Sequence, residues 1–259
     1  MTAEAALSGL VGDLSNYLWP FLRIGAFVMV MPLVGSFFVP ATARLLIGFA
    51  LTIVMMPVLP AYTVPDIFSL AGLIVVAQEL VIGIAMGFAA QLMFDAITLG
   101  GQVIAMSMGL GFAVFLDRAR GVNVPVLGQL FLLLGMLIFL ALDGHLALIQ
   151  ILAESFQILP ISAGGLNIPA ISLLLEWTAQ IFVLALKVAL PALTALIVVN
   201  LSFGVMSRAA PTLNLFAVGF PVAMLLGFVV IYLNIGGLQE NVVLMLGDTL
   251  GMLPAMLSP

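Results

Sequence analysis

Long apolar stretches separated by short polar breaks make up most of the chain. They run from Trp19 to Phe38, Leu45 to Tyr62, Ile67 to Phe94, Val122 to Leu142, Leu146 to Leu159, Ile171 to Met206, Ala209 to Gln239 and Val242 to Leu257. The apolar positions are continuous and do not alternate with period two, which disfavours a strand barrel. Most stretches approach or exceed the roughly 20 residues that a helix needs to cross a bilayer, so we predict an all-α polytopic membrane protein of about six to eight helical segments.

Proline and glycine mark the connections between these segments. Pro40 and a cluster from Pro57 to Pro65 bracket the second stretch, and the sequence PISAGGLNIP from Pro160 to Pro169 is the clearest loop. Pro191 and Pro221 fall inside apolar stretches, where they are expected to kink helices or to start half-helices. Since no linker separates soluble domains, the chain is expected to form one continuous apolar body.

Composition narrows the class of protein. Of 259 residues, 64% are hydrophobic and 7% are charged, whereas a soluble domain carries about a quarter of its residues as charged side chains. This excludes an ordinary soluble enzyme, and a net charge of −5 offers no field for nucleic acid. Glu4 and Asp13 argue against a cleavable signal peptide, so the first apolar stretch is expected to be a permanent helix.

Candidate catalytic and metal-binding groups are few. With no cysteine and one histidine, the chain lacks a ligand set for a metal, and no nucleotide-binding loop is present, so no cofactor is expected. A protease would need Ser107 as nucleophile and His145 as base, but the sequence does not bring them together. We instead expect Asp143 to cap a helix and His145 to satisfy a local carbonyl.

Five ionisable residues lie in or beside apolar stretches, where an unpaired charge is costly: Glu79, Asp95, Glu154, Glu176 and Lys187. One reading is a proton or ion relay in a secondary transporter. The favoured reading is structural, with Gln78-Glu79 and Lys187 pairing across helix–helix contacts.

Glycines suggest close packing and a possible constriction. Gly83 and Gly87 form a small-xxx-small face that lets two helices approach closely. A second group of glycines is expected to interrupt the helix among bulky, adaptable side chains. The glycines are Gly100, Gly101, Gly109 and Gly111, and the bulky residues are Met106, Met108, Phe112 and Phe115. Composition alone favours an ordinary packed helix and loop over a mobile constriction.

Three stretches together resemble the FliR family of flagellar export-apparatus proteins, which is homologous to the SctT component of virulence type III secretion systems. They are GLGFAVFLDRARGVNVPVLGQ around Asp117, IFLALDGHLALIQILAESFQILP around Asp143, and LPALTALIVVNLSFGVMSRAAPTLNLFAVGFPVAMLLG around Asn200. The similarity covers essentially the whole chain.

This resemblance implies a non-enzymatic subunit of the export gate in the bacterial inner membrane, at the flagellar basal body. Its implied partners are FliP-like and FliQ-like subunits, with FlhB-like and FlhA-like proteins nearby, and unfolded flagellar proteins pass through the complex. Residues 1–180 are expected to be FliP-like and residues 181–259 to form a FliQ-like helical hairpin. A virulence export gate remains an alternative.

The resemblance also implies a loop that plugs the closed channel, at about residues 106–121. It favours a constriction formed by Met106, Met108, Gly109, Gly111, Phe112 and Phe115. The family pattern has a proline soon after the loop aspartate, whereas in this sequence Arg118 follows Asp117. A second polar motif is expected at an interhelical turn. The polar residues expected in structural or subunit contacts are Glu79, Asp117, Asp143, His145, Lys187, Asn200, Arg208 and Asn214.

Overall fold

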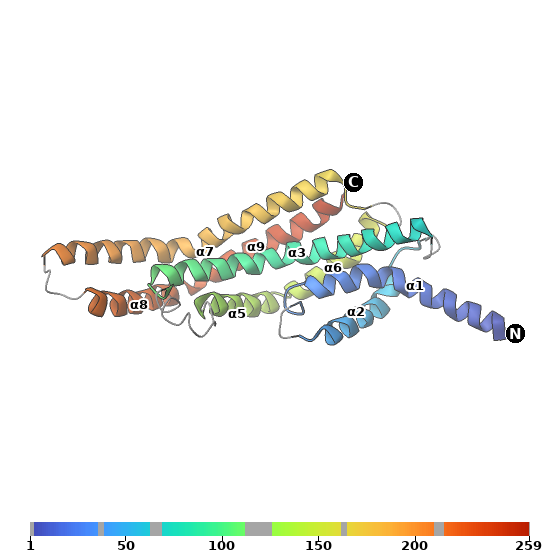
Figure 1. Ribbon diagram of the computed structural model, residues 1–259, viewed down its shortest axis with the longest axis horizontal. Helices are drawn as coiled ribbons and strands as arrows, with labels where there is room; N and C mark the ends of the chain where they lie inside the picture. Colours follow the sequence, from blue (N-terminus) through green and yellow to red (C-terminus); the bar gives the residue numbers. More distant parts are fainter. Residues whose placement is uncertain are drawn as a thin grey trace. The chain divides into compact units, whose positions relative to one another are not determined.

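The computed structural model describes residues 3–35, 39–62, 69–111, 126–161, 165–209 and 215–258. Eight α-helices and no strand occur in these ranges, which confirms the all-α prediction (Figure 1). The helices are α1 (Ala3–Val30), α2 (Ala41–Met55), α3 (Leu70–Ser107), α5 (Val126–Ala141), α6 (Gly144–Ile158), α7 (Ile168–Ala209), α8 (Leu215–Leu233) and α9 (Ile235–Leu257), and a 3₁₀ helix, η1, covers Met56–Val58.

Three of these segments are long and apolar enough to cross a membrane: Ala41–Val58, Leu70–Ser107 and Ile168–Met206. The number rises to as many as five if two bent pairs of helices, α5 with α6 and α8 with α9, are each counted as one span. The side chains that face outward agree with an apolar environment. On α2 and α7, for example, Leu46, Val54 and Phe182 are each at least 65% exposed.

The chain forms two compact units. The first contains Met1–Leu92, Asp143–Thr178 and Gly247–Pro259, and the second contains Met93–Leu142 and Ala179–Leu246. Helices α3, α7 and α9 therefore each contribute residues to both units.

Glycine governs the packing of the first unit. A Cβ atom at Gly83 of α3 would lie 2.3 Å from the Arg23 carbonyl oxygen of α1, and one at Gly87 would lie 2.9 Å from the Phe27 carbonyl oxygen. These contacts confirm the predicted small-residue face, since any side chain would push the two helices apart. Helix α2 packs on α1 in the same way, with an ideal Cβ at Gly48 only 3.2 Å from the Gly25 Cα.

Glycines also set the packing of the second unit, and here the sequence prediction was wrong. Gly100 and Gly101 do not interrupt the helix, because α3 continues to Ser107. A Cβ at Gly100 would lie 3.0 Å from the Ala185 carbonyl oxygen of α7, and one at Gly101 would lie 2.9 Å from the Leu127 carbonyl oxygen of α5. Adjacent glycines thus let one helix meet two neighbours on two sides, and the tight contacts stabilise the helix despite their low propensity.

Candidate functional site

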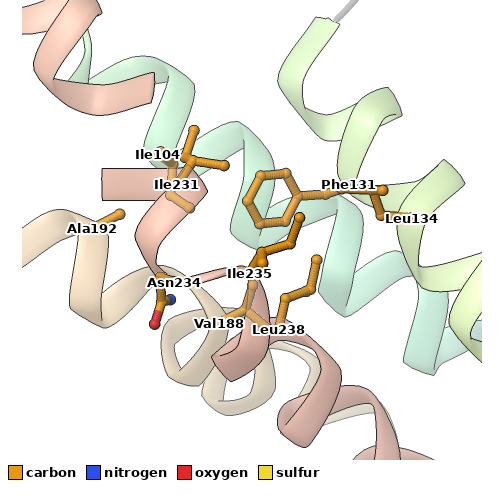
Figure 2. A pocket seen from close by; sticks show the side chains of 9 residues that line it. All are labelled: Ile104, Phe131, Leu134, Val188, Ala192, Ile231, Asn234, Ile235 and Leu238. Atoms are coloured by element: carbon orange, nitrogen blue, oxygen red, sulfur yellow. The ribbon is translucent and has the colours of Figure 1, made fainter. Parts of the chain in front are cut away.

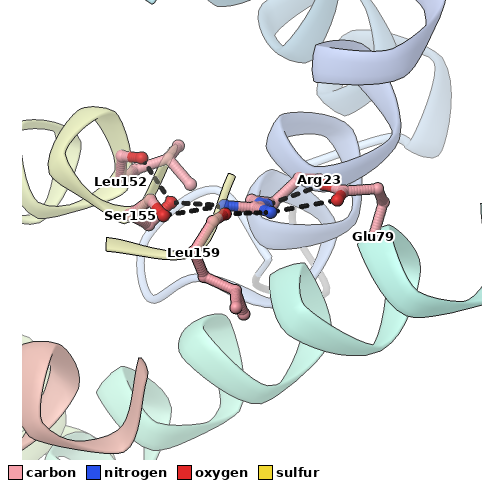
Figure 3. Close-up of polar contacts among 5 residues, drawn as sticks. All are labelled: Arg23, Glu79, Leu152, Ser155 and Leu159. Carbon is pink, nitrogen blue, oxygen red and sulfur yellow. Dashed lines mark hydrogen bonds and ion pairs between the residues drawn. The ribbon is translucent and has the colours of Figure 1, made fainter. Parts of the chain in front are cut away.

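A buried ion pair lies at the centre of the first unit. Arg23 of α1 is fully buried and Glu79 of α3 is 1% exposed. The Arg23 Nε donates to Glu79 Oε2 at 2.7 Å, and Nη2 donates to Glu79 Oε1 at 3.0 Å (Figure 3). The two parallel bonds give the planar fork geometry in which guanidinium and carboxylate interact most strongly.

The remaining donors of the guanidinium bind the end of α6. Nη1 donates to the carbonyl oxygen and the hydroxyl of Ser155 at 3.0 and 3.2 Å, and Nη2 donates to the Leu159 carbonyl oxygen at 2.9 Å (Figure 3). The Phe156 ring lies 4.3 Å from the guanidinium carbon. All five N–H groups of Arg23 therefore have an acceptor, and the positive charge lies at the C-terminal end of α6, where it interacts favourably with the helix dipole.

This network joins three helices that are distant in sequence, and each of its groups is satisfied. It confirms that Glu79 pairs across a helix–helix contact, but its partner is Arg23, which the sequence analysis did not select. The available signal was that Arg23 is the lone charge of the first apolar stretch, just as Glu79 is the lone charge of the third.

The second feature is the C-terminal end of α3, where the proposed plug begins. The Leu110 N–H donates to the Ala105 carbonyl and the Gly109 N–H donates to the Met106 carbonyl, both at 3.0 Å. Gly109 has a φ of 83°. These bonds and this left-handed glycine define a Schellman motif, which ends the helix and redirects the chain.

The two methionines at this end face different surroundings. Met106 is 72% exposed, whereas Met108 is 1% exposed. Met108 packs so closely on α8 that a Cβ at Gly227 would lie 2.5 Å from its Cγ. Asn200 of α7 also reaches this end, and its Nδ2 donates to the Ser107 carbonyl at 3.4 Å. No described atom lies within 4 Å of an ideal Cβ at Gly111, and Phe112, Phe115 and Asp117 lie outside the described residues.

A small cavity lies beside the same segment in the second unit (Figure 2). It has a volume of about 20 Å³ and is lined by Ile104, Phe131, Leu134, Val188, Ala192, Ile231, Asn234, Ile235 and Leu238. Asn234 is the polar member of this lining and lies at the break between α8 and α9, which are bent by 57°. The volume suits about one water molecule, so this cavity is not a substrate site.

Other predicted residues behave differently from the sequence expectation. Asp143 precedes α6 with a φ of 54°, and its side chain makes no capping hydrogen bond. Its carbonyl oxygen, not its carboxylate, accepts the bonds from Leu146 and Ala147 at 2.9 and 3.1 Å. The buried His145 Nδ1 has no partner among the described residues. The prediction that the Asp143 side chain caps the helix was wrong, because the left-handed backbone at Asp143 differs from the extended conformation that a side-chain cap needs.

The remaining polar residues lie on the surface of the chain or outside the described part. Lys187 is exposed on α7 and forms no ion pair with another described residue, so its expected pairing across a helix–helix contact stays a prediction. Arg208 is exposed in the last turn of α7, where a cation interacts favourably with the helix dipole. Asn214 lies outside the described ranges. The Ser107 hydroxyl donates to the Val103 carbonyl at 3.0 Å within its own helix.

Comparison with known proteins decides the family. Residues 14–247 match the family described as "Bacterial export proteins, family 1". The chain is 39% identical over 227 residues to the flagellar biosynthetic protein FliR of Escherichia coli K12, which covers 88% of this chain and 85% of the relative. The chain belongs to the FliR family.

More distant FliR relatives align over the same extent. The FliR protein of Aquifex aeolicus is 31% identical over 86% of both chains. That of Bacillus subtilis is 26% identical over 87% of this chain and 88% of its own length. FliR proteins are non-enzymatic membrane components of the flagellar export apparatus, in agreement with the expectation from the resemblance.

Proposed function

We propose that this chain is a channel-forming subunit of the flagellar export gate in the bacterial inner membrane, at the flagellar basal body. It assembles with FliP-like and FliQ-like subunits, close to FlhB-like and FlhA-like proteins, and unfolded flagellar proteins cross the membrane through the complex. The observation that carries this proposal is the match of residues 14–247 to one export family, with FliR proteins as full-length relatives.

The distribution of exposed apolar side chains supports assembly with partner subunits. Large apolar residues are exposed along α2, α5, α7 and α8, including Leu133, Leu201 and Leu225 at 56–67%. Contiguous apolar surface of this kind needs either lipid or protein to cover it. In the proposed assembly, residues 1–180 act as the FliP-like part and residues 181–259 as the FliQ-like hairpin.

The end of α3 supports the proposed plug. Met108 packs against Gly227 and so fixes the C-terminal end of α3 to α8. Met106 is exposed and can therefore line the proposed channel. Gly109 ends the rigid helix between Met108 and the loop that follows. An adaptable Met/Phe loop tethered in this way seals an empty conduit by excluding water and yields when a polypeptide passes.

Deletion of the gene in its own bacterium, followed by complementation, tests this function. We expect the deletion strain to secrete no hook or filament protein and to be non-motile, and the full chain to restore both. Affinity purification of a tagged chain from solubilised membranes should yield FliP-like and FliQ-like subunits, identified by mass spectrometry. Normal motility combined with loss of secreted virulence proteins would instead indicate the virulence export gate.

A proton-coupled secondary transporter, the function from a different class, receives less support. Glu79, the acid that the transporter model needs most, is fixed by two hydrogen bonds to Arg23 in a closed network. Transport of a small solute by the purified chain alone in vesicles would favour that function and contradict the export gate.

A further inference from the structure

The outward face of α7 in the second unit includes one stripe of residues with a seven-residue repeat, beside other exposed apolar residues such as Phe182, Leu186 and Val198. Seven of its positions follow alternating spacings of three and four residues: Gln180, Val183, Lys187, Leu190, Thr194, Ile197 and Leu201. All seven side chains are exposed. This set, called here the α7 seam, has the 3.5-residue periodicity with which one helix presents a continuous stripe to a second helix.

The described residues of the second unit do not pack on the α7 seam. The opposite face of α7 packs inward, with Ala185, Val188, Ala189, Ala192 and Leu196 each at most 3% exposed. That face provides the close contact with Gly100 of α3. In contrast, the apolar seam residues Val183, Leu190, Ile197 and Leu201 are 47–65% exposed. The repeat therefore serves no packing among the described residues of its own unit.

The two kinds of seam position differ in polarity. Gln180, Lys187 and Thr194 occupy the first position of three successive heptads, and Val183, Leu190 and Ile197 occupy the fourth; Leu201, at the next first position, ends the polar series. Polar residues at the first position fix the register and the choice of partner in paired helices, whereas apolar residues at the fourth supply contact area. A surface that faced only lipid would need neither the repeat nor the polar series.

Lys187 determines the chemistry of the partner. It lies at the midpoint of the candidate span Ile168–Met206 and is the one charged residue between Glu176 and Arg208. The structure shows no hydrogen bond or ion pair from Lys187 to any described residue. A cation on an apolar helix face within a membrane span is expected to meet an anionic group.

We propose that the α7 seam receives one apolar helix of a neighbouring export-apparatus subunit, with an aspartate or glutamate of that helix opposite Lys187. This inference rests on the proposed function, which supplies the class of neighbour. The two helices pack in the left-handed manner common in membrane bundles, and the ion pair sets their register.

Substitutions of Lys187 in the whole complex test the inference. The full chain is co-produced with the other membrane subunits of its export apparatus, and the yield of complex per membrane-inserted chain is measured for K187R, K187M and K187E. We expect K187R to assemble within about twofold of wild type. We expect K187M to lose about tenfold or more, because it leaves a buried carboxylate unpaired. K187E should lose more, and replacement of the partner's carboxylate with lysine should restore it.

Contact with lipid predicts the reverse order. If Lys187 faced lipid, K187M would remove a charge from hydrocarbon, and the complex would form as well as wild type or better; that result would overturn the proposal. The control F182M changes a side chain that is 65% exposed on the same helix but outside the α7 seam, and should leave the yield unchanged. A wild-type chain that recovers no export subunit at all would instead overturn the proposed function.

Cross-linking provides a readout that does not depend on assembly strength. The chain has no cysteine, so one cysteine at Leu190 or, as a control, at Phe182 is its only thiol. The second cysteine is placed one turn from each acidic residue in the apolar helices of the partner subunits. A disulfide from position 190 and none from position 182 supports the α7 seam, whereas equal or absent cross-linking from both positions refutes it.

Discussion

Removal of one partner of the buried Arg23–Glu79 pair should be among the most destabilising single substitutions in the first unit. Alanine at Arg23 removes five hydrogen bonds at once and leaves Glu79, 1% exposed, without its counter-charge. Removal of one partner from a buried ion pair costs about 3–5 kcal/mol in the free energy of unfolding. It also removes the guanidinium donors from the Leu159 carbonyl and from the Ser155 carbonyl, which keeps only its bond from the Leu159 N–H.

Two further variants separate the contributions of charge and of hydrogen bonding. Glu79→Gln keeps one acceptor for the guanidinium, so a smaller loss of about 1–3 kcal/mol is expected. The exchange Arg23→Glu with Glu79→Arg preserves the pair but places a carboxylate against the Ser155 and Leu159 carbonyls. We therefore expect the exchange not to restore stability, although an isolated salt bridge would be restored.

The assay is equilibrium unfolding of the purified complex, or of the chain in detergent. The free energy of unfolding is measured for wild type, Arg23→Ala, Glu79→Ala and the double variant, which together form a double-mutant cycle. The double variant should be less destabilised than the sum of the two single variants, because each single change leaves one buried charge unpaired. Single-variant losses below about 1 kcal/mol, the value typical of exposed pairs, would refute the reasoning.

Three other predictions concern glycines and the plug. Gly83→Ala should prevent stable packing of α1 on α3 and lower the amount of folded chain, measured by protease resistance in membranes. Gly247→Ala, in α9 with no described atom within 4 Å of the added Cβ, should stabilise by up to about 1 kcal/mol. If Gly83→Ala and Gly247→Ala change the amount of folded chain equally, close helix packing is not the cause of the loss in Gly83→Ala. Gly109→Ala should strain a residue with a φ of 83° and lower export, while Gly109→Asn retains more activity because asparagine tolerates this conformation; equal secretion by both would contradict the role of the turn. Deletion of Phe112 to Phe115 should make cells leak small ions while export partly persists, and unchanged membrane conductance would argue strongly against the plug.

The sequence prediction succeeded for features that depend on one segment of the chain and failed for features that depend on contacts between helices. The apolar stretches predicted the helices because a continuous apolar run in a membrane protein must hydrogen-bond internally. Gly83 and Gly87 were predicted correctly, since their spacing on one helix face is visible in one segment. Gly100 and Gly101 were misread as helix breaks, because their role depends on two other helices that the local sequence does not reveal.

For the polar residues too, local properties could be predicted from neighbouring residues, whereas contacts with distant residues could not. The burial cost of Glu79 could be inferred from its apolar neighbours, but its partner Arg23 is 56 positions away and Ser155 is 132 positions from Arg23. For Asp143 the sequence indicated a helix start, and only the backbone conformation decided that its carbonyl, not its carboxylate, accepts the first bonds. The contrast between the exposed Met106 and the buried Met108 was equally invisible in the sequence.

The sequence by itself determined the apolar environment and the family of this protein. It has too few charges for a water-facing surface, and its apolar stretches must be helical. Its polar motifs resemble those of FliR proteins. The tertiary structure alone decided which charges are satisfied and which remain exposed. Helical periodicity depends on near neighbours along the chain, whereas pairing of Arg23 with Glu79, and the exposure of Lys187, depend on which helix faces meet in space.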